Sequence, residues 1–143
     1  MVSMTVEPIG IYTITDLKRE REREDGLRWE LLDGELVMTP SPRTVHQAIV
    51  RELTLRLAPQ APDGAQLFTA PLDVRLDERN VLQPDLMLVA EDIIGDEFVS
   101  GAPILVVEIL SPSTRRRDLV TKRDILERGR DIDDGGARYN WVE

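Results

Sequence analysis

The chain has 143 residues, a length that fits one domain built around a single hydrophobic core. Hydrophobic residues make up 41% of it and charged residues 31%, with 18 basic against 27 acidic side chains and a formal net charge of −9. This composition excludes a membrane-spanning protein, a collagen-like chain and a basic protein that coats DNA without specificity.

Two residue types that often carry chemistry are scarce. There is no cysteine, and His46 is the only histidine. Disulfides, thiolate zinc sites, a cysteine nucleophile and a zinc site of two or three imidazoles are therefore excluded. The first ten residues lack the basic and apolar segments of a signal peptide, so we expect a cytoplasmic protein.

The first quarter of the chain predicts a helix and then a hairpin. A short charged helix is expected over 16–24, with Thr15 as its cap. Asp33-Gly34 between two apolar runs predicts a β-hairpin over 28–38 with a two-residue turn. Its pairing divides the side chains between two faces, with Trp29, Leu31, Leu36 and Met38 on one and Glu30, Leu32 and Val37 on the other.

A longer helix is predicted after the break at Pro40–Pro42. Thr44 and Gln47 have capping-box spacing, and the helix should run to about Ala58. Its apolar residues fall in one sector, which we expect to face the core: Val45, Ile49, Val50, Leu53 and Leu57. His46 lies in the middle of this sector, as either a satisfied core histidine or a catalytic group.

The rest of the chain completes an α/β pattern. In chain order it predicts strands over 68–76, 85–90 and 104–110, a helix over 118–128 and a last strand over 138–142. The segment 104–110 is apolar at six of seven positions, which is typical of a central strand buried on both faces. The order helix, strand, strand, strand, helix, strand indicates a layered α/β fold. We expect one domain over 1–143, with residues 1–12 flexible.

Two acidic residues are the strongest candidates for a site. Glu108 is the only charge in its apolar strand, where an isolated carboxylate needs a cation, a metal or a proton, unless it reaches solvent or an arginine at the strand end. Asp85 follows Pro84 at the start of another strand, as a site residue or as an ordinary turn or cap residue. Two carboxylates on adjacent strands, without histidine or cysteine partners, would suit Mg²⁺ or Mn²⁺.

Lys122 is one of only two lysines beside 16 arginines. Helical spacing places it between Leu119 and Leu126, on the face expected to turn toward the sheet. Its ammonium either extends to solvent or points into a site at the strand ends. A lysine differs from an arginine there because its pKa can shift, whereas arginine stays protonated.

Weaker candidates lie on the hairpin and in the loop before the last helix. Glu30 either joins the metal site or is an exposed strand glutamate. Arg115, Arg116 and Arg117 either contact phosphates near the strand ends or form a solvated loop. They belong to the stretch 113–130, which holds seven basic and three acidic residues in an otherwise acidic chain.

Several segments together resemble a known family. They are Trp29-Glu-Leu-Leu-Asp-Gly-Glu-Leu36, His46, Gln83-Pro-Asp85 and Val106-Val-Glu-Ile-Leu-Ser-Pro-Ser-Thr114, followed by Asp118 and Lys122. Over about 16–129 the chain resembles the Uma family of "putative restriction endonucleases" in the PD-(D/E)XK nuclease superfamily. The resemblance implies a restriction-endonuclease-like core with a mixed central sheet, preceded by a helix and a β-hairpin.

The resemblance also implies a chemistry for the candidate residues. Asp85 and Glu108, with the Ile109 carbonyl, would hold Mg²⁺ or Mn²⁺ for hydrolysis of DNA phosphodiester bonds. The superfamily normally places a lysine two residues after the second acid, where this chain has Leu110. Lys122 would then supply that charge from the next helix, orienting water or offsetting charge on the phosphate. Glu30 and His46 match family positions whose roles are less settled.

The end of the chain departs from the family pattern. After Gly129, the segment 130–137 intervenes before a stretch with Tyr139 and Trp141. We therefore expect residues 130–143 to be a divergent or truncated end, and a second subunit to supply the missing cover in a homodimer. The sequence leaves three functions open: a metal-dependent DNA endonuclease, a catalytically inactive nuclease-fold module for nucleic-acid binding or assembly, and a small-molecule hydrolase. The third has no nucleophile-and-base pair behind it.

Overall fold

A computed structural model describes residues 10–23, 25–39, 41–110 and 116–129. Its helices are α1 (Ile14–Arg21), α2 (Thr44–Leu57) and α3 (Arg116–Arg128), with single 3₁₀ turns at Ala58–Gln60 and Glu91–Ile93. Its strands are β1 (Arg28–Leu32), β2 (Glu35–Thr39), β3 (Ala65–Thr69), β4 (Asp73–Asp77), β5 (Asn80–Leu82), β6 (Leu86–Ala90), β7 (Phe98–Val99) and β8 (Leu105–Val107). No helix of this described part is long and apolar enough to cross a membrane.

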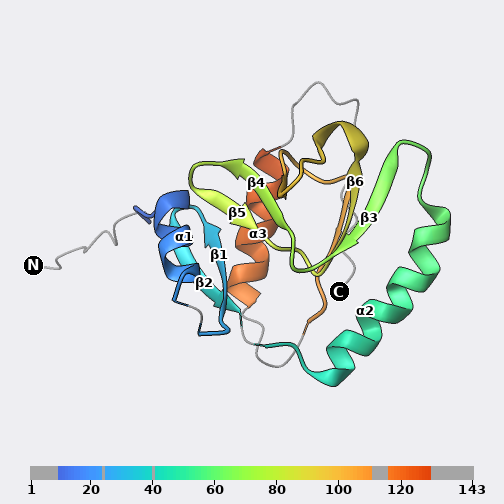
Figure 1. Cartoon of the computed structure of the whole chain (residues 1–143), viewed down its shortest axis with the longest axis horizontal. Helices are drawn as coiled ribbons and strands as arrows, with labels where there is room; N and C mark the ends of the chain where they lie inside the picture. Colours follow the sequence, from blue (N-terminus) through green and yellow to red (C-terminus); the bar gives the residue numbers. More distant parts are fainter. Residues whose placement is uncertain (1–9, 24, 40, 111–115, 130–143) are drawn as a thin grey trace, which may run out of the picture.

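The strands form two sheets that share one core with α3 (Figure 1). One sheet has the order β2-β1-β5-β4-β7 and is mixed, because β4 and β7 are parallel; the other has the order β3-β6-β8. The core combines side chains of both sheets and of α3: Leu32, Val74, Leu82, Met87, Val89, Val99, Val106, Ile125 and Leu126. This arrangement confirms the predicted α/β class with a mixed sheet.

The hairpin forms as predicted. Asp33 and Gly34 both have positive φ, 49° and 74°, as a two-residue type I′ turn requires. Leu31 packs with Leu17 of α1, whereas Leu32 points to the main core, so the two faces are as expected. The helix before the hairpin is displaced from the prediction. It begins at Ile14 rather than 16, and its cap is not Thr15 but Thr13, whose N–H donates to the Asp16 carboxylate at 2.9 Å.

Gly34 yields a stability prediction. A Cβ at this residue would collide with the backbone of Gly10, and φ is already in the left-handed region. We expect Gly34→Ala to lower the free energy of unfolding by about 2 kcal/mol or more in urea denaturation. Gly64→Ala is the control, since Gly64 has φ +80° but no atom within 4 Å of its added Cβ. Equal losses in the two variants would contradict a role for the close approach to Gly10.

The strand predicted over 68–76 is wrong as a single element. The chain forms β3 and β4 instead, and these belong to different sheets. Pro71 lies between them and has no N–H to continue a ladder. The alternation misled because Phe68 of β3, Leu72 of the connection and Leu76 of β4 all pack against the same core.

The strand predicted over 104–110 is shorter than expected. It covers only Leu105–Val107, and within the described residues it pairs with β6 alone. In that part of the chain β6, not β8, is therefore the middle strand of its sheet. The predicted last strand over 138–142 and the segment 1–9 lie outside the described residues.

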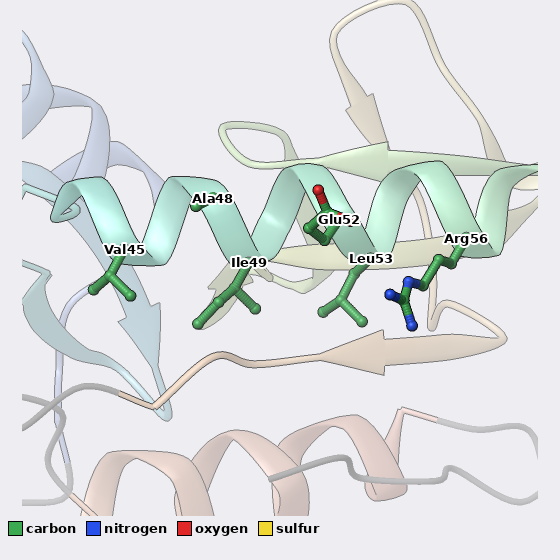
Figure 2. A pocket seen from close by; sticks show the side chains of 6 residues that line it. All are labelled: Val45, Ala48, Ile49, Glu52, Leu53 and Arg56. Carbon is green, nitrogen blue, oxygen red and sulfur yellow. The ribbon is translucent and has the colours of Figure 1, made fainter.

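Helix α2 has the predicted extent but not the predicted packing. Arg43 is its N-cap, without a side-chain cap bond, so the expected capping box from Thr44 is wrong. No residue of α2 is buried, and Val45 and Ile49 are 63% and 40% exposed. Figure 2 shows Val45, Ile49 and Leu53 projecting from one side of the helix, along a shallow groove. The described part of the chain covers this side only in part, since Val50, Leu53 and Leu57 are half-buried.

Candidate active site

Asp85 and Glu108 lie opposite each other because of the register of β6 and β8. Leu86 pairs with Val107 in the antiparallel β6–β8 ladder, which places the preceding Asp85 opposite the following Glu108. Both residues are buried, at 9% and 8% exposure. Asp85 Oδ2 accepts a hydrogen bond from the Ile109 N–H at 2.8 Å. The two carboxylates therefore lie opposite each other at neighbouring strand ends, as the sequence predicts.

Lys122 points into this unit from α3. Its Nζ lies 2.7 Å from Glu30 Oε1 and 3.4 Å from Glu108 Oε1, and its side chain is only 10% exposed. The neighbouring Ile125 and Leu126 pack into the core, which turns this face of α3 toward the sheets. The interpretation in which Lys122 extends to solvent is wrong, and among the side chains that the structure describes, the cation beside Glu108 is this lysine.

Glu30 is a buried member of the same cluster. It is 2% exposed, so it is not the exposed strand glutamate considered above. Its Oε2 accepts from the Gln83 N–H at 2.8 Å, and its Oε1 accepts from the Thr39 hydroxyl at 3.2 Å. Together with Lys122, these contacts engage both oxygens of the carboxylate.

His46 reaches the site from the first turn of α2. Its Nε2 lies 3.2 Å from Asp85 Oδ1, and its side chain is 16% exposed. Its Nδ1 is buried and has no hydrogen-bond partner among the described residues. His46 is therefore not a fully satisfied core histidine, and it adjoins the carboxylate pair.

Burial controls the charge of the cluster. Desolvation raises the pKa of Glu108 from its ordinary 4.5 to about 8; the Lys122 ammonium opposes this, while the Glu30 and Asp85 carboxylates reinforce it. Burial also acts to lower the pKa of Lys122, but the carboxylates of Glu30 and Glu108 outweigh it and hold that pKa above its ordinary value. In the metal-free protein, burial therefore favours the protonated form of Glu108, and the two carboxylates favour the charged form of Lys122.

The remaining candidates are not placed in the site. Arg115 lies outside the described residues, and Arg116 and Arg117 are described only as the backbone of the first residues of α3.

The sequence prediction also missed Thr39. Since Glu30 pairs with Val37, Thr39 lies diagonally across the hairpin on the same face, and this register would have indicated its contact with Glu30.

The donor set suits a hard divalent cation. Among the described residues, no three histidine, cysteine, aspartate or glutamate side chains are arranged as a metal-holding group. Mg²⁺, however, commonly binds through one or two carboxylates and keeps several waters. Asp85 and Glu108 provide such a pair, because they are buried opposite each other at the ends of β6 and β8. The residues therefore fit Mg²⁺ or Mn²⁺.

Comparisons with known proteins identify the family and the fold. The model of a family named Uma2 and described as "Putative restriction endonuclease" matches residues 15–128. A solved structure titled as a "putative nuclease belonging to DUF820" from Anabaena variabilis is similar in fold, with 22% identity and a TM-score of 0.51. The match covers 69% of this chain and 58% of that one, so the chain spans little more than half of its length. No curated protein matches the chain.

Proposed function

The chain belongs to the Uma2 family, and on that premise we propose that it is a metal-dependent endonuclease that hydrolyses DNA phosphodiester bonds. The observation that supports this most directly is the meeting of Asp85, Glu108 and Lys122 in one buried cluster. Burying three ionisable side chains costs desolvation free energy. Packing alone therefore does not account for a cluster whose members come from distant parts of the chain.

Each residue has a role in this proposal. Asp85 and Glu108, with the Ile109 carbonyl, would hold Mg²⁺ or Mn²⁺. Such an ion, when bound, polarises a phosphate and lowers the pKa of a bound water. The Ile109 N–H, by donating to Asp85 Oδ2, fixes the orientation of that carboxylate. Lys122 would orient the attacking water or offset negative charge on the phosphate oxygens.

We also propose contacts with DNA and a homodimeric assembly. Arg115, Arg116 and Arg117 would contact DNA phosphates beside the site. The exposed apolar side of α2, with Val45 and Ile49, supports a homodimer of single-domain chains, because a second copy would cover it. Size-exclusion chromatography with light scattering distinguishes the dimer from a monomer.

A nuclease-fold module without catalytic activity is the second candidate. It is favoured by the net charge of −9, which opposes DNA binding, and by the absence of a three-ligand group in the described residues. Such a module would act in nucleic-acid binding or assembly and would show no metal-dependent cleavage.

A plasmid cleavage assay separates these functions. With Mg²⁺ or Mn²⁺ we expect the wild type to nick supercoiled plasmid and EDTA to abolish the activity. Asp85→Asn, Glu108→Gln and Lys122→Ala should each lower the rate by about 10²-fold or more, since the first two would each remove a charged ligand of the metal ion and the third would remove the positive charge proposed to act on the water or the phosphate. Glu97→Gln is the matched control, because Glu97 is an exposed acid outside the cluster, and it should cut at the wild-type rate.

Each pattern of results has its own meaning. Cleavage that survives EDTA or the Asp85 and Glu108 substitutions would come from another source and would contradict the proposal. If only Lys122→Ala still cut at the wild-type rate, the metal pair would stand and the assignment of Lys122 would be wrong. A wild type that neither binds Mn²⁺ nor cuts would favour the inactive module.

A further inference from the structure

Glu30 is the most firmly held side chain of the cluster. It takes one hydrogen bond from the main chain of Gln83, just before β6, and one from the hydroxyl of Thr39 on β2. Its position on β1, in the middle of the hairpin, fixes its backbone as well. These contacts leave the carboxylate little freedom before Lys122 is considered.

Lys122 has two carboxylates within reach but is not equidistant from them. Its Nζ is 2.7 Å from Glu30 Oε1, a tight ion pair, and 3.4 Å from Glu108 Oε1, a long one. A lysine stem is flexible, so the ammonium lies where its strongest partner holds it. Glu30 therefore determines how closely Lys122 approaches Glu108.

Without the charge of Glu30, Glu108 would become the stronger partner of the two. The ammonium would need to move by less than about 1 Å to reach ordinary ion-pair distance from Glu108. Because the cluster is buried, that attraction would be stronger than at the surface. A tight Lys122–Glu108 pair would occupy the oxygens that the proposed metal ion needs.

We propose that Glu30 is a positioning residue that holds Lys122 back from Glu108 and so keeps the Glu108 carboxylate available for a divalent cation. This inference rests on the proposed metal-dependent function, since it concerns the same site. It assigns Glu30 no contact with the metal or with DNA.

Mn²⁺ binding to the purified protein without DNA tests the inference, with free Mn²⁺ measured by electron paramagnetic resonance. We expect Glu30→Gln to weaken Mn²⁺ binding by about 10- to 100-fold, the effect usual for residues that support metal ligands. Thr39→Val, which removes one of the bonds that hold Glu30, should weaken it less. Glu97→Gln is the matched control: it makes the same change at an exposed acid outside the cluster, and it should leave Mn²⁺ binding unchanged.

A double-mutant cycle separates positioning from a direct effect of the Glu30 charge. In a Lys122→Met background no ammonium can move onto Glu108, so the further change Glu30→Gln should no longer weaken Mn²⁺ binding. The same loss in both backgrounds would show that Glu30 attracts or binds the metal itself, and would overturn the inference.

The remaining outcomes distinguish the inference from the proposed function. If the wild type and Glu30→Gln bind Mn²⁺ equally well, the inference alone is overturned. If the wild type binds no Mn²⁺, both fail. If the wild type binds Mn²⁺, Glu30→Gln binds it weakly and neither cuts plasmid, the inference is supported and the nuclease function is not.

Discussion

Lys122→Met is expected to lower the free energy of unfolding by about 3–5 kcal/mol, the usual effect of removing one partner of a buried ion pair. Methionine keeps the length of the side chain but leaves Glu30, 2% exposed, without its cation at 2.7 Å. Glu108 loses its positive neighbour as well. Urea denaturation at pH 7 in EDTA, with midpoint and slope both compared, measures the loss.

The other lysine provides the control for this experiment. Lys18 is exposed on α1, so Lys18→Met should change the stability by no more than about 0.5 kcal/mol. Adding Glu30→Gln to Lys122→Met should recover part of the loss, because the uncompensated charge disappears while a carbonyl oxygen remains to accept the Gln83 N–H bond. A loss below about 1 kcal/mol in Lys122→Met would contradict the burial of this ion pair.

Glu108→Gln is expected to stabilise the metal-free protein increasingly as the pH rises. The pKa of Glu108 is raised by burial from 4.5 to about 8 in the folded state. Between these values the folded chain holds a proton that the unfolded chain has released, so wild-type stability falls as the pH increases from about 4.5 and levels off above about 8. Glutamine mimics the protonated side chain and has no such penalty.

Thermal denaturation in EDTA at pH 5.5 and pH 8.5 tests this dependence. The penalty grows by up to about 1.4 kcal/mol per pH unit, so we expect Glu108→Gln to melt at least about 5 °C above the wild type at pH 8.5 and less than that at pH 5.5. Adding Mn²⁺ at pH 8.5 should raise the melting temperature of the wild type and not that of Glu108→Gln. Glu97→Gln should show neither effect. A difference independent of pH would mean that Glu108 has an ordinary pKa.

The sequence predicted those parts of the fold that depend on local chemistry. The Asp33-Gly34 turn and the extent of α2 follow from short-range rules, and both are confirmed. The separation of β3 from β4 could not be predicted from alternation, because side chains of two sheets meet in one core. Pro71 was the local sign of that separation.

The candidate site was predictable in its members but not in its contacts. Burial of a lone carboxylate in an apolar strand identified Glu108, and the β6–β8 register brings Asp85 beside it. That Lys122 binds Glu30 more closely than Glu108 depends on how α3 packs against the hairpin, a tertiary contact with no local signature. For the same reason the sequence placed the apolar side of α2 in the core, whereas Val45 and Ile49 are exposed.

The long-range origin of the cluster has a kinetic consequence. Its bonds join residues 53 positions apart, between Glu30 and Gln83, and 24 apart, between Asp85 and Ile109. We expect contacts between such distant residues to form late in folding, because closing a long loop costs chain entropy before the contact can stabilise it. We therefore expect substitutions in the cluster to raise the unfolding rate and to change the folding rate little. The cluster that we propose for catalysis would thus also slow unfolding and so prolong the lifetime of the folded state.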